Sequence, residues 1–135
     1  MQVLGPSSPF EIPAISVQVE SFPLPQHSQP EIGRYVFGYR IRISNDSLVD
    51  VQLLDRYWFI TDGIGRQQEV RGKGVIGEQP MILAGTVYEY SSFCPLTTSF
   101  GYMQGHYGMR DDKGRAFEVA IPLFVLGDRA LEALN

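Results

Sequence analysis

The sequence predicts an all-β domain, a sandwich of two antiparallel sheets with about seven or eight strands. Apolar residues alternate with polar ones through most of the chain, and turn residues recur about every 10–15 residues. No segment of the body has the period of an α-helix. A chain of 135 residues fits one domain, and its aromatic content of 12% suits strands.

The first half of the chain predicts four strands. Six of the nine prolines lie in the first 30 residues, so we expect an extended edge around a short strand over 15–20. Alternation is longest over 34–44, where one face carries Tyr35, Phe37, Tyr39, Ile41 and Ile43. A strand over 51–61 is apolar on both faces at its end, which predicts a central position. A turn over 62–65 joins it to a strand over 66–71.

The second half predicts strands over 86–93 and 103–109. The turn Asp111-Asp112-Lys113-Gly114 then predicts a hairpin whose return strand points Phe117, Val119 and Ile121 inward. We divide the chain into a loose extension over 1–13, the sandwich over 14–126, and a tail over 127–135. The tail has a helix-like composition and would make one or two turns.

Composition argues against several classes of protein. The net charge of −4 opposes nucleic-acid binding, which requires a basic face. Pro122 interrupts the longest apolar run, over 120–126, which is too short for membrane insertion. The first residues lack the pattern of a signal peptide. Because the single cysteine, Cys94, cannot form an internal disulfide, we expect a cytoplasmic location.

A GxGxxG spacing at Gly72, Gly74 and Gly77 is the strongest candidate motif. A dinucleotide site needs a helix directly after these glycines and an acidic residue about 20 positions further on. Gln79 and Pro80 interrupt any such helix, and 92–97 contains no carboxylate. We therefore expect a turn or bulge between strands. As an alternative, the glycine amides form an anion nest, flanked by Arg71 and Lys73, that binds phosphate or pyrophosphate.

Other candidate sites have weaker patterns, and we expect no metal, no cofactor and no catalytic residue. The two histidines, His27 and His106, lie far apart, without the spacing of a zinc site. Cys94 could act as a nucleophile if His106 lay on a neighbouring strand, but a packed apolar thiol is the simpler expectation. A basic patch would form if Arg40, Arg42 and Arg56 shared one sheet face; we expect a solvated face instead.

Six segments, in order, closely resemble the ApaG family over about residues 14–126. They are RYVFGYRIRISN (34–45), VQLLDRYWFITDGIG (51–65), VRGKGVIGEQP (70–80), FCPL (93–96), GYMQGHYGM (101–109) and VAIPLF (119–124). The resemblance implies an immunoglobulin-like or fibronectin type III-like sandwich. Related domains in F-box proteins and in a DNA-polymerase-delta-interacting protein look like protein-interaction modules.

The resemblance also implies a function without established catalytic residues. The family carries a label tied to magnesium and cobalt efflux or resistance, and pyrophosphate binding at its GxGxxG segment has been suggested. A chain without a membrane span would have an accessory role in such efflux. We therefore expect a non-enzymatic module that binds a protein partner. The alternative is a phosphate-ligand binder, or a weak nucleotide-processing enzyme, that uses Arg71, Gly72, Lys73, Gly74 and Gly77.

Overall fold

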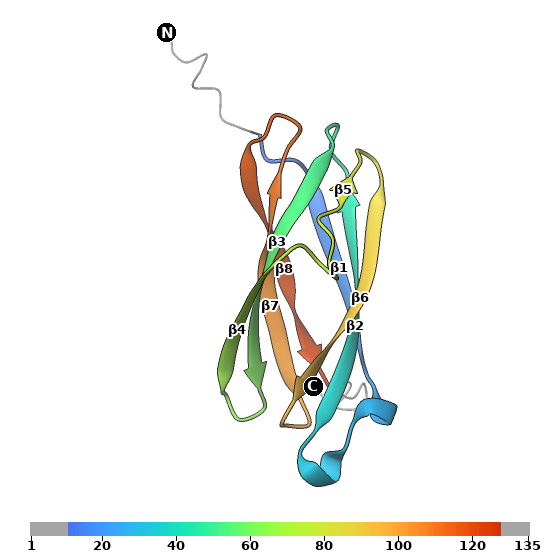
Figure 1. Cartoon of the computed structure of the whole chain (residues 1–135), viewed down its shortest axis with the longest axis vertical. Helices are drawn as coiled ribbons and strands as arrows, with labels where there is room; N and C mark the ends of the chain where they lie inside the picture. Colours follow the sequence, from blue (N-terminus) through green and yellow to red (C-terminus); the bar gives the residue numbers. More distant parts are fainter. Residues whose placement is uncertain (1–10, 128–135) are drawn as a thin grey trace.

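The computed structural model describes residues 11–127 and consists of two antiparallel β-sheets packed face to face (Figure 1). The small sheet has the strand order β1-β2-β6, and the large sheet has the order β4-β3-β7-β8 with β5 paired to β3. The strands are β1 (Ile15–Pro23), β2 (Tyr35–Asn45), β3 (Val51–Asp62), β4 (Gln67–Lys73), β5 (Met81–Ile82), β6 (Val87–Leu96), β7 (Gly101–Arg110) and β8 (Ala116–Leu126). Two short 3₁₀ turns, η2 (Pro25–His27) and η3 (Pro30–Ile32), connect β1 to β2.

The predicted all-β sandwich is confirmed, as is the central position of β3 between β4 and β7. The two-residue strand β5 and the two 3₁₀ turns were not predicted, because segments of two or three residues have no detectable period. The predicted helical tail lies outside the described residues, apart from Gly127. No helix between residues 11 and 127 is long and apolar enough to cross a membrane.

The core forms between the sheets, where the inward-facing residues of both meet. Ile41 and Ile43 of β2 are fully buried, as are Leu53 of β3 and Tyr107 of β7. Trp58 of β3 connects the two layers. Its ring makes edge contacts with three other rings, those of Tyr39 (β2), Tyr107 (β7) and Phe124 (β8). Trp58 therefore packs at the centre of the sandwich rather than within one sheet.

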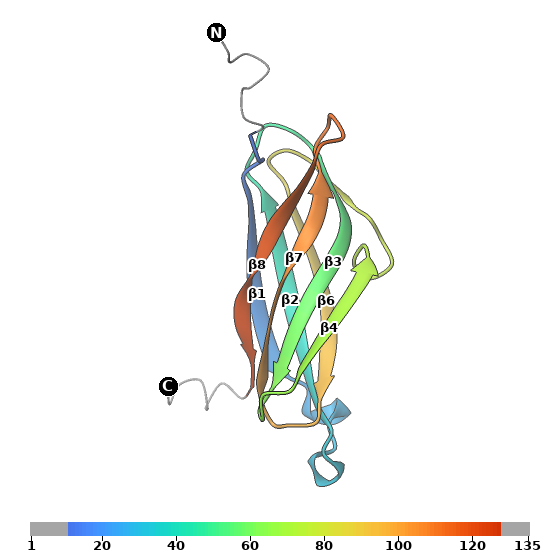
Figure 2. The same cartoon turned by 90° about the vertical axis from the view of Figure 1, so that its left-hand side faces the viewer.

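One side of the sandwich is closed, and the other has two free strand edges. On the closed side β1 lies beside β8 (Figure 2), and the Ser21 hydroxyl donates to the Val125 carbonyl at 2.6 Å. On the other side, β4 and β6 end their sheets, each with a strand partner on one edge only. Residues 74–80 connect β4 to β5, and the side chain of Val75 is fully buried.

The hairpins β3–β4 and β7–β8 share one turn construction. In each, an aspartate begins the turn, a glycine with positive φ lies three residues later, and an arginine follows that glycine. The Asp62 carboxylate accepts hydrogen bonds from the Ile64 and Arg66 amides and from the Arg66 side chain. Asp111 does the same with Lys113 and Arg115. Each carboxylate thus replaces missing backbone partners at the sharpest point of the hairpin.

These two turns predict a loss of stability in acid. Burial raises the pKa of Asp62 and Asp111, but the hydrogen bonds and the paired arginines outweigh burial and lower both below the ordinary 3.8. Since the folded-state pKa values are depressed, the stabilisation is present above about pH 4 and is lost as the pH falls through them. In urea titrations between about pH 2 and 6, the wild type should lose more stability than Asp62→Asn/Asp111→Asn. If the free energy of unfolding had the same pH dependence in the wild type and the double variant, the two carboxylates would not stabilise the turns.

Candidate functional site

The glycine-rich segment, residues 71–80, ends β4 and forms a tight turn, as the sequence predicts. Val75 and Glu78 exchange two backbone hydrogen bonds of 2.8 and 2.9 Å. The two residues between them, Ile76 and Gly77, have φ values of 42° and 81°. Two successive positive φ values are typical of a type I′ hairpin turn. No helix follows the glycines, so the prediction of a turn between β-elements is confirmed.

The three glycines of the motif differ in what a side chain at each position would meet. Gly74 has φ +65°, and a Cβ at this position would lie 2.0 Å from the Glu78 carbonyl oxygen. Gly77 also has positive φ, but a Cβ there would meet nothing within 4 Å. A Cβ at Gly72 would lie 2.7 Å from the guanidinium of Arg56. Gly74 is therefore required by close packing against backbone, and Gly77 is favoured by backbone conformation alone. At Gly72 a Cβ would require only that the flexible Arg56 side chain move.

Arg56 is the residue of this site that the sequence analysis missed. It faces Gly72 directly across the β3–β4 pair, and its Nη1 donates to the carbonyl oxygens of Lys73 and Gly74 at 3.2 and 2.9 Å. The Gly74 amide in turn donates to the Leu54 carbonyl. The position of Arg56 could have been predicted from the sequence, because the turn over 62–65 fixes the register of the β3–β4 hairpin and so pairs Arg56 with Gly72. An arginine opposite a glycine suggests that its side chain covers the glycine.

The two predicted basic residues of the segment belong to the end of β4 and face the outer side of the large sheet. Arg71 extends over the outer face of the large sheet, with its guanidinium 4.8 Å from the centre of the Tyr57 ring and 3.9 Å from Glu69. Lys73 is exposed, and in the β4 alternation it shares that face with Arg71. The Gly74, Val75 and Glu78 amides donate to backbone carbonyls. Phosphate binding by this segment stays a prediction.

Three tyrosine hydroxyls lie in the interior near Arg56. Burial raises the pKa of Tyr39, Tyr90 and Tyr107, while the positive charge of Arg56 acts in the opposite direction. The Tyr90 and Tyr107 hydroxyls form a hydrogen bond with each other, which joins the small sheet to the large one. All three hydroxyls are therefore protonated at neutral pH and act as hydrogen-bonding groups of the core.

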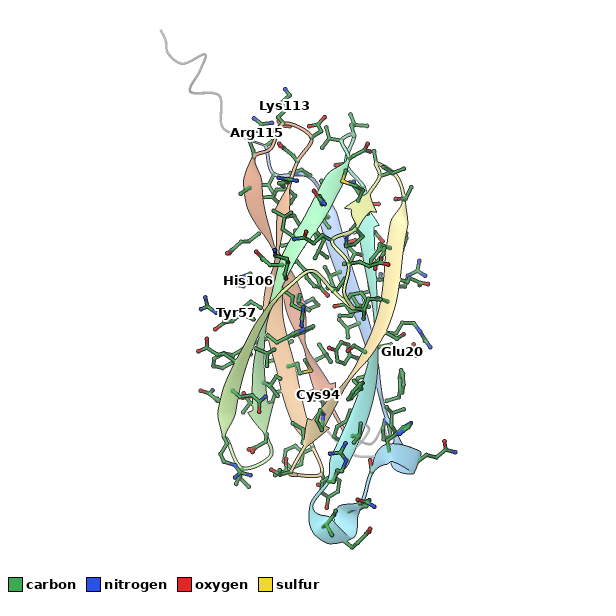
Figure 3. The ribbon with its side chains drawn as sticks, viewed as in Figure 1. Glu20, Tyr57, Cys94, His106, Lys113 and Arg115 are labelled. Carbon is green, nitrogen blue, oxygen red and sulfur yellow. The ribbon has the colours of Figure 1, made fainter. Side chains whose placement is uncertain are left out.

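The hypothesis that Cys94 and His106 form a catalytic pair is wrong. The strands that carry them, β6 and β7, follow each other in sequence but belong to different sheets. Cys94 points into the core, and burial raises the pKa of its thiol to about 11, so little thiolate forms at neutral pH. His106 lies on the outer face of the large sheet and stacks on Tyr57 at 5.0 Å (Figure 3).

The conditional basic patch of Arg40, Arg42 and Arg56 does not form, because Arg56 belongs to the other sheet and faces inward. Arg40 and Arg42 lie on the outer face of the small sheet, where they form ion pairs with Glu20 and Glu89. The expectation of a solvated face is the correct one for both. Within residues 11–127, no three metal-ligating side chains come close enough to hold a metal ion.

Two of the cavities on the described part of the surface are well formed, and residues 71–80 line neither of these two. The first has about 340 Å³ and lies beside the β3–β4 turn; its lining is Ile60, Asp62, Arg66, Gln67, Gln68, Pro95, Leu96 and Thr97. Its charges are already paired, since Arg66 bonds to both Asp62 and Thr97. The second, which we call the rim cavity, has about 300 Å³ and is lined by Leu24, His27, Arg34, Val36 and Phe93.

Comparison with known proteins agrees with the resemblance found in the sequence. The family model described as the ApaG domain matches residues 25–111. The chain is 54% identical over 112 residues to Protein ApaG of Mesorhizobium japonicum, covering 83% of this chain and 86% of that one. It is 55% identical over 117 residues to Protein ApaG of Rhizobium etli, covering 87% and 90%.

A solved structure has the same fold. The crystal structure of a Bordetella pertussis protein called ApaA superposes with a TM-score of 0.84 and 42% sequence identity. The superposition covers 89% of this chain and 98% of that one. With the eight strands of the described part in two antiparallel sheets and relatives of this similarity, the chain belongs to the ApaG family.

Proposed function

We propose that this protein is a non-enzymatic interaction module whose protein partner pairs with the free edge of β6. The observation that carries the proposal is a ten-residue strand with a partner on one edge only. Unpaired backbone groups in a row are a template for the addition of another strand. Exposed apolar side chains accompany this edge: Val87 is 46% exposed and Phe93 is 62% exposed.

The hydrogen-bonding pattern identifies which groups of β6 face outward. In β2, the amide and carbonyl of Val36 bond to Ser28 and Leu24, on the side away from β6. Pro95, which is paired with Val36, therefore directs its carbonyl to the free edge of β6. Because hydrogen-bonded and non-hydrogen-bonded pairs alternate along an antiparallel ladder, every second residue of β6 does the same. The free-edge residues are the odd-numbered ones: Val87, Glu89, Ser91, Phe93 and Pro95. Pro95 itself agrees with this, since proline occurs on edge strands.

The edge of β4 is less suited to a partner strand. Its outward residues include Glu69, Arg71 and Lys73, and charged side chains on an edge oppose the addition of a strand. The β6 edge carries one charged residue, Glu89, which is already paired with Arg42. The two edges are thus natural test and control surfaces within one molecule.

Proline substitution tests the proposal. Ser91→Pro removes one outward amide from the middle of β6 and leaves the ladder to β2 intact. We expect the proteins captured from native cell extract by the tagged chain, quantified by mass spectrometry, to fall about tenfold or more with this variant, because a lost backbone hydrogen bond and a steric block act together.

The matched control is Glu69→Pro, which removes an outward amide from β4 in the same way. It should retain the captured proteins. Circular dichroism and urea titration would verify that both variants are folded. Equal capture by wild type and both variants would remove the β6 edge from consideration.

The proposal extends to an accessory, cytoplasmic role in magnesium and cobalt homeostasis, acting through the captured partner. The support is the family resemblance described above, and the single thiol suits a reducing compartment. In a strain that lacks the chain, complementation of any cobalt sensitivity should fail with Ser91→Pro and succeed with Glu69→Pro.

A further inference from the structure

The rim cavity lies on the outer face of the small sheet, and its wall is held in place before any ligand arrives. The floor is Val36 of β2, and the opposite walls are Leu24 and Phe93. The Leu24 amide donates to the Val36 carbonyl at 2.8 Å, and the Ser28 hydroxyl donates to the Leu24 carbonyl at 2.8 Å. The Val36 amide donates back to the Ser28 hydroxyl at 2.9 Å.

These bonds fix the η2 turn against β2, and the flanking prolines Pro23, Pro25 and Pro30 restrict the connecting chain further. A preformed wall lowers the entropic cost of binding. The cavity is therefore a built feature rather than a gap under a loose loop.

Among the residues that the structure describes, the Arg34 side chain is unpaired, unlike those of Arg40 and Arg42 on the same face of the small sheet. Arg40 is 2.7 Å from Glu20, and Arg42 is paired with Glu89. The guanidinium of Arg34, at the mouth of the cavity, has no hydrogen bond or ion pair with any residue between 11 and 127. The His27 imidazole on the other side of the mouth likewise has no partner in that range. The mouth thus offers donors to an anion, while the walls are apolar.

We propose that the rim cavity binds the C-terminal residue of the partner polypeptide. Its apolar side chain packs between Leu24 and Phe93, and its α-carboxylate pairs with Arg34. This inference rests on the proposed function and names the part of the partner that is recognised.

Size and charge support this occupant, and the direction of β6 fixes how the partner strand must run. A volume of about 300 Å³ is at the lower end of ligand sites, which suits one side chain with its terminal carboxylate. A guanidinium is well matched to a carboxylate, with which it forms two parallel hydrogen bonds. In Figure 1, β6 runs toward the end of the molecule that holds η2 and η3. A segment pairing in parallel with β6 would therefore direct its carboxyl end toward the cavity.

Synthetic peptides test the assignment on the intact protein. An acetylated hexapeptide of glycine and serine ending in leucine is compared with its C-terminal amide and with the same peptide extended by two glycines. Calorimetry should show the free carboxylate binding about tenfold or more tighter than either, because the charge-assisted hydrogen bonds are lost in both. Amide resonances around Leu24, Val36 and Phe93 should shift.

Variants on one sheet face supply the controls. Arg34→Gln should weaken the free-carboxylate peptide about tenfold, whereas Arg42→Gln, whose guanidinium is already paired with Glu89, should change its affinity less than about twofold. Equal effects of the two variants, equal binding of acid and amide, or no shift at millimolar peptide would overturn the proposal.

Two other outcomes would assign the cavity to a different occupant and also overturn it. Equal affinity for N-acetylleucine and for the peptide would identify a small organic acid as the ligand. A dimer that is detected by sedimentation and abolished by Phe93→Asp would identify a second copy of this chain as the occupant. If the peptides fail while Ser91→Pro still removes the captured proteins, the β6 edge proposal stands and the cavity assignment alone is lost.

Discussion

Gly74→Ala is expected to lower the free energy of unfolding by about 2–5 kcal/mol. A residue with a Cβ at φ +65° loses about 1–2 kcal/mol from the left-handed conformation. The new Cβ would also lie 2.0 Å from the Glu78 carbonyl oxygen, and backbone cannot move aside as a flexible side chain can. The shift would strain the Val75–Glu78 turn and the bond from Gly74 to Leu54. Urea denaturation monitored by tryptophan fluorescence measures the change.

Gly77→Asn is the matched control within the same motif. Its φ of 81° is in the region that asparagine tolerates, and nothing lies within 4 Å of a Cβ there. We expect a change within about 1 kcal/mol. Equal losses at both positions would contradict the structural account of the motif. Pyrophosphate titrated into the stable Gly77→Asn variant and the wild type then tests anion binding separately, through the amide resonances of 71–78.

Trp58→Ala is expected to cost about 3–5 kcal/mol, since it removes the largest side chain that connects the two sheets. The indole is 3% exposed and touches the rings of Tyr39 and Phe124 among others. The cavity left behind would be walled by residues of both sheets, so it cannot close by moving one strand. Chemical denaturation followed by far-ultraviolet circular dichroism measures the loss, because the tryptophan signal is absent.

The adjacent residue provides the control for Trp58. Tyr57 points to the outer face, where it stacks on His106 and bonds through its hydroxyl to Glu69. That hydrogen bond to Glu69 is the main reason why the pKa of Tyr57 is raised. Because the cluster faces water, Tyr57→Ala should cost about 1 kcal/mol. A cost as large as that of Trp58→Ala would mean that the inward and outward faces of β3 are assigned wrongly.

The sequence was sufficient for most of the fold because strand alternation has a period of two. Phe117, Val119 and Ile121 are expected to face inward from their alternation, and all three are buried. The period of two also indicates which residues of β2 face water. The assignment of strands to sheets has no such local signal, so the sequence could not decide whether Cys94 and His106 lie on neighbouring strands; the structure puts them in different sheets. The simpler expectation, a packed Cys94 thiol, is confirmed.

The candidate sites were only partly predictable from the sequence. The GxGxxG turn was recognised from its spacing, but the flanking residues Arg71 and Lys73 alternate onto the outer sheet face, as period two requires. The rim cavity combines side chains from η2, β2 and β6, which are separated by as many as 69 positions between Leu24 and Phe93. Their proximity follows from the β2–β6 pairing, for which the sequence alone gives no register.

Site-specific photo-cross-linking in the native cell tests most directly whether the β6 face, rather than the glycine turn, contacts the partner. A photoreactive phenylalanine analogue replaces either Phe93 on β6 or Ile76 at the turn, which are 62% and 57% exposed and so equally available to a partner. The account predicts a covalent adduct with another protein from position 93, reduced by Ser91→Pro, and none from position 76. An adduct from position 76 alone would contradict it.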